Sequence, residues 1–243
     1  MTETTVLSDT PRAQREEPEN EDRTQRNAAR AEAVAAVARE FAAAVDEEGR
    51  FPREAIDEAR AQGLLGAPMA EADGGLGWSI TELCRMLERV GRECTSTAMI
   101  LAMHHSQTLC LTRHADTEYL RDFTRRVATE GLLLASATTE VNIGGNTRSS
   151  TCAVRPAGDG RVHLHKTCPV ISYGAYADAI LVTARASEEA ASSDQVLLVV
   201  EAADLQLERQ RGWDALGMRG TCSESFELDA TTRADAVFTA LFE

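Results

Sequence analysis

Small and hydroxyl side chains gather in the segment SATTEVNIGG, which begins at Ser136 and ends in two glycines. The segment has too little bulk to build a hydrophobic core by itself. Hydroxyl groups and accessible backbone at the end of a strand suit a planar polar heterocycle that must approach the chain closely. The residue types therefore predict a binding loop for a flat, polar ligand.

A carboxylate and two pairs of histidines are the other candidates for chemistry. Glu140 lies inside the hydroxyl segment, and we interpret it as a structural partner of an arginine, with Arg219 as the candidate, rather than as a catalytic base. His104 and His105 are adjacent on a helical segment, so they point to different faces and cannot bind one metal together. The HxH pair that begins at His163 shares a strand face but lacks a nearby third zinc ligand. We expect no metal site.

Charge and cysteine usage limit the class of protein. The formal net charge of −14 at pH 7 argues against nucleic acid and against an anionic membrane surface as partners. The N-terminal segment lacks the apolar stretch of a signal peptide, and we find no apolar run of about 18 residues. Six scattered cysteines without a CxxC pair are typical of buried thiols in a reducing cytoplasm.

The hydrophobic pattern predicts an α+β chain in two domains. Residues 1–28 are charged and almost free of large apolar side chains, which predicts a disordered acidic tail. Residues 29–131 carry apolar side chains at spacings of three and four, which predicts an N-terminal domain made only of helices. Gly63 is expected to end the second helix, and Ser79 with Glu82 has the spacing of a capping box that begins the third. The apolar face of that third helix is expected to hold Ile80, Leu83, Cys84, Leu87 and Val90.

After Glu130 the hydrophobic period changes to two. The run RVHLHKT alternates strictly, and the turn AGDG before it predicts a hairpin with STCAVR. The continuous apolar runs AILVTARA and QVLLVV indicate strands that are buried on both faces. Residues 132–243 are therefore predicted to form a small antiparallel barrel or sandwich that follows the helical domain.

Four blocks of the sequence, in order, resemble the acyl-CoA dehydrogenase family. The first contains a Phe-Pro helix start, a Gly-Leu pair and a loop with three glycines. The second is a strand-end flavin loop, the third is a second flavin loop with the strand after it, and the fourth is a Leu-Gly-x-Arg-Gly-Thr block. In this chain the four blocks read FPREAIDEARAQGLLGAPMAEADGGLGWS, SATTEVNIGGNTRSS, VISYGAYADAILVTAR and WDALGMRGTCSESFEL.

The resemblance implies FAD as the cofactor, bound at the edge of the middle β domain. By position, Ala137, Thr138 and Thr139 would lie beside the flavin, and Thr139 would be the side-chain donor toward the ring. Ile171 and Ser172 would contact the flavin from the second loop. Flavin positioning is the part of the family's chemistry that these residues would supply.

The sequence departs from the family pattern at several positions. Val141 stands where the family usually has proline, Cys168 replaces a common lysine, and Val170 replaces an aromatic residue. The family's Ser-Asp pair, which helps hold the CoA portion, is Gly145-Asn146 here, so Gly145 marks the expected substrate contact. The resemblance also implies a third domain, a C-terminal four-helix domain that carries the catalytic carboxylate. We expect this domain to be missing, so that no residue of the chain is assigned as catalytic.

Three functions follow from these observations. The first is a truncated, poorly active acyl-CoA dehydrogenase-like flavoprotein of fatty acid metabolism, which acts on the CH–CH group of an acyl-CoA or another small molecule. An electron-transfer flavoprotein would accept its electrons. The second is a flavin-dependent monooxygenase of the same fold, and the third is a non-catalytic remnant or interaction module. A second copy, or a partner that supplies a helical domain, is expected to associate with the chain.

Overall fold

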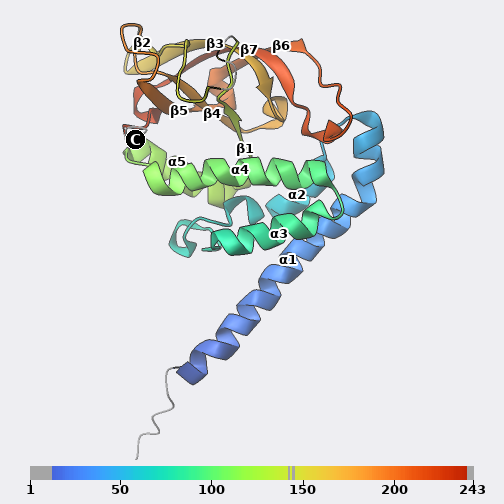
Figure 1. Ribbon diagram of the computed structural model, residues 1–243. Coiled ribbons are helices and arrows are strands. Elements are labelled where there is room, and N and C mark those ends of the chain that lie inside the picture. The colour runs from blue at the N-terminus through green and yellow to red at the C-terminus, as the bar shows by residue number, and fades with distance from the viewer. Residues whose placement is uncertain (1–12, 142, 144–145, 240–243) are drawn as a thin grey trace, which may run out of the picture.

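Helices come first and strands second along this chain (Figure 1). The computed structural model describes residues 13–141, 143 and 146–239, and within them five α-helices precede seven strands. The change from helix to strand follows the change in hydrophobic period after Glu130, so the predicted α+β class is confirmed. The helices are α1 (Ala13–Glu48), α2 (Arg53–Ala61), α3 (Ile80–Gly91), α4 (Thr95–His114) and α5 (Glu118–Arg126).

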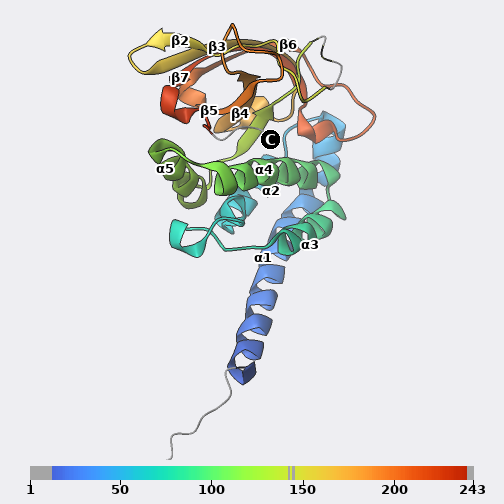
Figure 2. The ribbon, with the colours of Figure 1, turned by 60° about the vertical axis from the view of Figure 1, so that its left-hand side comes forward.

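The first helix begins earlier than its apolar pattern suggests. α1 starts at Ala13, so the predicted disorder is wrong for residues 13–28, while residues 1–12 lie outside the described residues. This charged segment is rich in Ala, Gln, Arg and Glu, which favour a helix without burial of apolar surface. Contacts with α3 also hold it, because Arg23 and Asn27 bind the Glu82 carboxylate at 3.2 and 2.9 Å. The start of α1 extends away from the domain in both ribbon views (Figure 2).

The predicted helix boundaries are confirmed at α2 and α3. Gly63 has a φ of +71°, a left-handed conformation that glycine adopts at little cost after a helix. At the start of α3, the Ser79 hydroxyl accepts a hydrogen bond from the Glu82 N–H at 3.3 Å. The Glu82 carboxylate in turn accepts one from the Ser79 N–H at 2.8 Å. This reciprocal pair completes the capping box.

The buried face of α3 differs from the predicted one by part of a turn. Leu83 and Val90 are buried as expected, and Met86 joins them in the core. Ile80 is 53% exposed and Cys84 is exposed as well, because α1 crosses α3 on the face that Met86 occupies. The sequence spacing alone does not decide between these two overlapping stripes.

The strands form two sheets. The first has the order β1-β4-β5 and the second has the order β2-β3-β7-β6. β1 pairs with β4 in parallel and the other pairs are antiparallel, so the sheets form a sandwich-like pair and do not close into a barrel among the described residues. The strands are β1 (Leu134–Ala137), β2 (Arg155–Gly158), β3 (Arg161–Ile171), β4 (Ala179–Arg185), β5 (Gln195–Glu201), β6 (Leu205–Arg211) and β7 (Glu224–Arg233).

The predicted hairpin is present but shorter than expected. β2 begins at Arg155 rather than at Ser150, and it pairs with β3 across the turn at Gly158, Asp159 and Gly160, which all have positive φ angles. Residues 150–152 leave the sheet because they bind the Glu140 carboxylate instead.

A buried histidine joins the helical domain to the first sheet. Within α4, His104 Nε2 donates to the Leu65 carbonyl at 2.7 Å, and Nδ1 accepts from the Leu134 N–H of β1 at 3.0 Å. Burial lowers the pKa of His104 to about 4, so the imidazole is neutral at pH 7. His105 is buried beside it and has no hydrogen bond to the described residues. Both histidines are therefore packed side chains.

Candidate functional site

The predicted ligand loop begins where β1 ends. Thr138 and Thr139 are half-buried, and the Thr139 hydroxyl donates a hydrogen bond to the Val170 carbonyl at 3.0 Å. Val170 is the penultimate residue of strand β3, at the start of the second predicted loop. The structure thus brings together two segments that are 31 residues apart in the sequence, through one side chain that the sequence singled out.

Buried side chains occupy two of the predicted positions. Ala137 and Ile171 are fully buried, and the Ala137 carbonyl accepts a hydrogen bond from Lys166. The Ile171 side chain lies against Gly174 and near Phe226 in the core of the second sheet. These two side chains therefore support the loops from beneath, and only their backbone lies near the sheet edge.

The hydroxyl of Ser172 belongs to a short chain of hydroxyl groups. Ser172 and Ser223 are 2.8 Å apart at their Oγ atoms, and Thr221 Oγ1 lies 2.8 Å from Ser223 Oγ. Thr221 in turn donates to the Met218 carbonyl at 2.8 Å. These linked hydroxyl groups connect the second predicted loop to the Leu-Gly-x-Arg-Gly-Thr block. The sequence placed both segments in the same family pattern but assigned no role to Ser223.

An ion pair lies beneath the first loop. The Lys166 ammonium group lies 3.1 Å from Glu140 Oε1, and the exposed fractions of the two side chains are 0% and 4%. The same ammonium group donates to the Ala137 carbonyl at 2.9 Å, the Thr183 carbonyl at 2.6 Å and the Thr183 hydroxyl at 3.1 Å. Lys166 comes from β3, whereas Ala137 and Thr183 belong to β1 and β4. One side chain therefore joins the two sheets directly below the loop.

Glu140 is held as a buried anion by Lys166 and by hydrogen bonds from Ser150 and Thr151. Burial alone would raise its pKa, but hydrogen bonds from Ser150 and Thr151 and the charge of Lys166 outweigh burial and lower the pKa to about 2. A general base works best with a pKa near the operating pH. The predicted structural role is consistent with this geometry, but the predicted partner Arg219 is wrong, because a lysine fills that position.

Arg219 lies elsewhere, at the junction with the helical domain. Its guanidinium is 3.9 Å from the Asp214 carboxylate and lies close to Gly49. The sequence reasoning missed Lys166, although one signal was available. Lys166 is two residues from both Leu164 and Cys168, so in a strand its side chain lies on the same inward face as theirs. An inward lysine requires a buried anion as its partner.

The edge formed by the two loops combines hydroxyl groups with exposed apolar groups. Val141 is 45% exposed and Val170 is 39% exposed, next to the hydroxyl of Thr139. Such an edge offers hydrogen-bonding atoms and exposed apolar surface, the two kinds of contact that a planar heterocycle needs. The remaining predicted contact, Gly145, lies outside the described residues.

The other candidates for chemistry are engaged in ordinary contacts. On β3, His163 lies 3.1 Å from Asp229 and His165 lies 3.1 Å from Glu227. No cluster of three or more potential metal ligands occurs in the described part of the chain. Burial raises the pKa of Cys168 to about 12, so this thiol is protonated at neutral pH. Among the described residues, no helix has both the length and the apolar composition needed to cross a membrane.

Comparisons with known proteins agree with this architecture. Residues 19–131 match the model of the acyl-CoA dehydrogenase N-terminal domain. Cyclohex-1-ene-1-carbonyl-CoA dehydrogenase of Geobacter metallireducens is 34% identical over 179 residues, which cover 73% of this chain and 47% of that relative. The chain spans about half the length of the curated relatives it matches.

Two solved structures share the fold at low sequence identity. The complex of TdsC from Paenibacillus sp. A11-2 with FMN and indole has a TM-score of 0.78 and 22% identity, over 89% of this chain and 54% of that chain. Butyryl-CoA dehydrogenase of Megasphaera elsdenii has a TM-score of 0.76 and 18% identity, over 98% of this chain and 61% of that chain. The sequence matches identify the chain as a member of the acyl-CoA dehydrogenase family.

Proposed function

We propose that this chain is the flavin-positioning part of an FAD-dependent oxidoreductase that acts on the CH–CH group of an acyl-CoA thioester. The observation that supports this most directly is the hydrogen bond from Thr139 to Val170, which joins the two family loops into one edge. The half-buried threonines and the exposed valines of that edge suit one face and one polar border of a flavin ring.

The residues of the chain would act by holding the flavin ring. Thr138 and Thr139 would offer hydroxyl and backbone groups to its polar border, and Val170 would cover part of a face. The ion pair of Lys166 and Glu140 would fix the position of the loop relative to the sheets. Such precision matters because a position error of about 1 Å is costly in a catalytic site. Bound flavin would supply the hydride acceptor, which no amino-acid side chain can provide.

A flavin-dependent monooxygenase of the same fold is the second candidate. One sequence observation favours it: the Ser-Asp pair that contacts CoA in the dehydrogenase pattern is Gly145-Asn146 here. The fold match to TdsC, whose structure is a complex with FMN and indole, is compatible with that function. Under this alternative the same edge would hold FMN rather than FAD, and the substrate would not be a CoA thioester.

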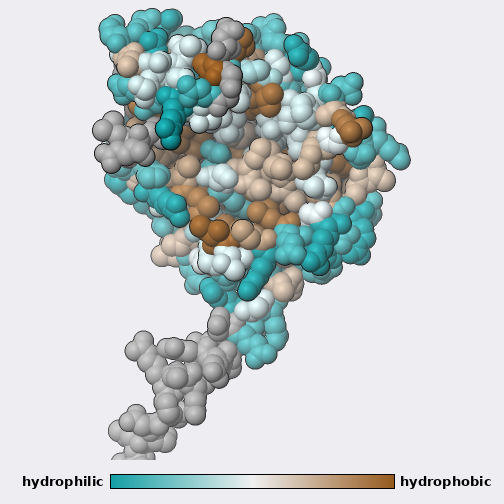
Figure 3. Space-filling model, viewed as in Figure 1, coloured by the Kyte–Doolittle hydropathy of each residue, from teal (hydrophilic) through white to brown (hydrophobic). Residues whose placement is uncertain are grey.

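An apolar stripe on α4 suggests where a partner of the chain could bind. Met99 is 39% exposed, and Ala102, Met103 and Leu109 are partly exposed on the same helix. Apolar side chains lie over α4 on the face seen in Figure 3. We propose that a helical domain or a second copy of the chain covers this stripe in the cytoplasm, and that an electron-transfer flavoprotein receives the electrons.

The test is a flavin titration of the purified chain. We expect saturable quenching of FAD fluorescence, and we expect Thr139→Val to weaken binding by about 1 kcal/mol because the substitution removes one ordinary hydrogen bond. Thr112→Val on α4 is the matched control, since Thr112 also donates to a backbone carbonyl but lies far from the loop. Tighter binding of FMN than of FAD would support the monooxygenase. A folded chain that binds neither flavin would support the non-catalytic module.

A further inference from the structure

A pocket lies between α1 and α3. These two helices lie on the side of the helical domain that faces away from the sheets (Figure 1). Its volume is about 250 Å³. This is slightly below the range of about 300–1,000 Å³ that holds drug-sized ligands, so the pocket suits a smaller molecule. None of its lining residues belongs to the loops at the end of β1 or β3, so it is separate from the candidate flavin edge.

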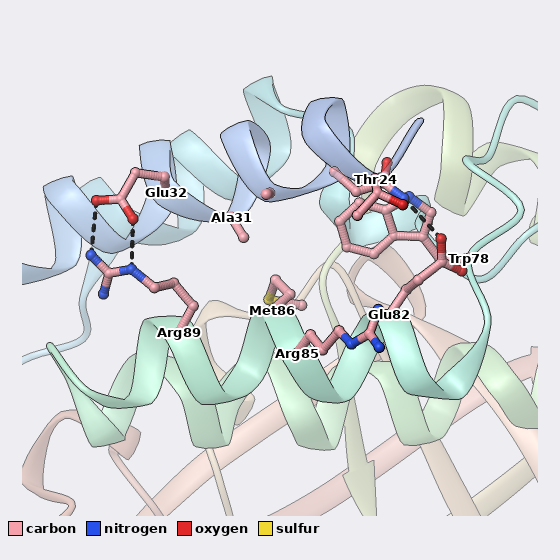
Figure 4. Close-up of a pocket in the computed structure, with 10 residues that line it drawn as sticks. Thr24, Ala31, Glu32, Trp78, Glu82, Arg85, Met86 and Arg89 are labelled. Carbon is pink, nitrogen blue, oxygen red and sulfur yellow. Dashed lines mark hydrogen bonds and ion pairs between the residues drawn. The ribbon is translucent and has the colours of Figure 1, made fainter. Parts of the chain in front are cut away.

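The middle of the pocket is apolar, and polar or aromatic side chains line its two ends. Ala28 and Ala31 of α1 face Met86 of α3, and the short alanine side chains leave the space between the helices unfilled. At one end, Arg89 binds the Glu32 carboxylate with two hydrogen bonds of 2.6 and 2.8 Å. Figure 4 shows this pair on one side of Met86.

The opposite end is formed by Trp78 and Glu82 (Figure 4). Trp78 is only 5% exposed, and it lines this end of the pocket. Its indole N–H is a hydrogen-bond donor, and an acceptor atom of a ligand in the pocket can pair with it.

Arg85 gives this end of the pocket an available positive charge. Its side chain extends along α3 toward Trp78 and Glu82 in Figure 4, and it forms no ion pair or hydrogen bond within the described ranges. The carboxylates that line the pocket do not neutralise it. Glu32 is bound by Arg89, and Glu82 is bound by Arg23, by Asn27 and by its own helix cap.

We propose that this pocket binds a small carboxylate with an apolar body, such as a short aliphatic acid. The apolar part lies between Ala28, Ala31 and Met86, and the carboxylate accepts hydrogen bonds from the Arg85 guanidinium and the Trp78 indole. The charge decides the ligand class, because Arg85 provides several donors to a planar carboxylate and nothing else in the described pocket neutralises it.

Hexanoate is a suitable probe, and Trp78 is a built-in reporter. The chain has two tryptophans, so Trp213→Phe, at an exposed position, leaves Trp78 as the only source of indole fluorescence. In this background we expect saturable change of fluorescence with hexanoate and at least tenfold weaker binding of hexanol, which has a similar apolar body without the charge. Ala31→Leu fills the space and should abolish the response.

Arg85→Met tests the proposed charge contact with the long side chain retained. We expect it to weaken hexanoate binding roughly tenfold or more, as for loss of a hydrogen bond to a charged group. Arg92→Met is the matched control, because Arg92 is an exposed arginine of the same segment, pairs with Glu88 and does not line the pocket. Both arginines lie at the surface, and circular dichroism is used to check that the variants are folded. The proposal is overturned if the folded chain gives no saturable response, if hexanol binds as tightly as hexanoate, or if the two arginine variants bind alike.

Discussion

A single ammonium group, that of Lys166 in β3, has contacts in two other strands and in the loop that follows β1. Its carbonyl and hydroxyl partners come from β1 and β4, and its carboxylate partner is Glu140. Removing one member of a buried ion pair leaves the other charge without compensation in a poorly polarisable interior. The pair therefore stabilises the two packed sheets and fixes the position of the candidate flavin loop relative to them.

We expect Lys166→Met to lower the free energy of unfolding by about 3–5 kcal/mol, because it leaves the Glu140 carboxylate buried and uncompensated. Urea unfolding followed by circular dichroism measures this. The double variant Lys166→Met with Glu140→Gln removes both charges and should be more stable than Lys166→Met alone. If the double variant is the less stable of the two, the charge of Glu140 is not the source of the loss.

The lowered pKa of Glu140 predicts how the stability of the fold depends on pH. Its pKa in the folded chain is about 2, below the ordinary value of 4.5, so the folded state favours the charged carboxylate. The resulting stability is fully present above pH 4.5 and is lost as the pH falls from 4.5 toward 2. Unfolding free energies measured at several pH values should show this decline, and Glu140→Gln should flatten it in that window. An equally steep decline in the variant would assign the effect to other groups.

At the level of elements, the caps fix where helices begin. Ser79→Ala removes the hydroxyl that accepts from the Glu82 N–H, and we expect a loss of about 0.5–2 kcal/mol in the free energy of unfolding. Ser106→Ala is the control, since Ser106 lies inside α4 and its hydroxyl only returns to the Ala102 carbonyl. Thermal and urea unfolding of both variants should show a loss at position 79 and little change at position 106.

Elements with a local signal were predictable, and those that depend on distant contacts were not. Gly63 and the capping box at Ser79 carry their structure in their own residue types. Strand β6, with the sequence LQLERQR, was missed because its side chains are mostly exposed and charged, and only pairing with β7 makes it a strand. The start of α1 was missed for a similar reason, since Arg23 and Asn27 gain their partner Glu82 only after α3 packs nearby.

The candidate site divides in the same way. The hydroxyl segment and the second loop were visible in the sequence, and the structure places Thr139 next to Val170. The pairing of Glu140 with Lys166 was not predicted, because it depends on how β3 of the second sheet packs against the first sheet. A pattern that marks which residues point inward does not say which of them meet.

At the scale of the whole molecule, we expect these 243 residues alone to show little or no acyl-CoA dehydrogenase turnover. The carboxylate that follows the candidate flavin loop, Glu140, is held by Lys166 and has a pKa of about 2, so it is a poor base. A positioned base typically contributes about 10²–10⁴-fold to the rate. The measurement is acyl-CoA-dependent reduction of an artificial electron acceptor with added FAD. Turnover equal to that of a full-length relative, from a monodisperse sample, would contradict this expectation.

The buried ion pair also constrains how the sequence can change over time. A lineage that loses Lys166 first retains a buried anion, and one that loses Glu140 first retains a buried cation, so either single step is strongly disfavoured. Replacement then requires two nearly simultaneous substitutions, or an intermediate in which Thr183 and Ser150 supply enough polar contacts to tolerate one lone charge. Positions 140 and 166 should therefore covary among descendants of this chain, while His163 and His165, on the other face of β3, belong to no fully buried ion pair and are free of this constraint.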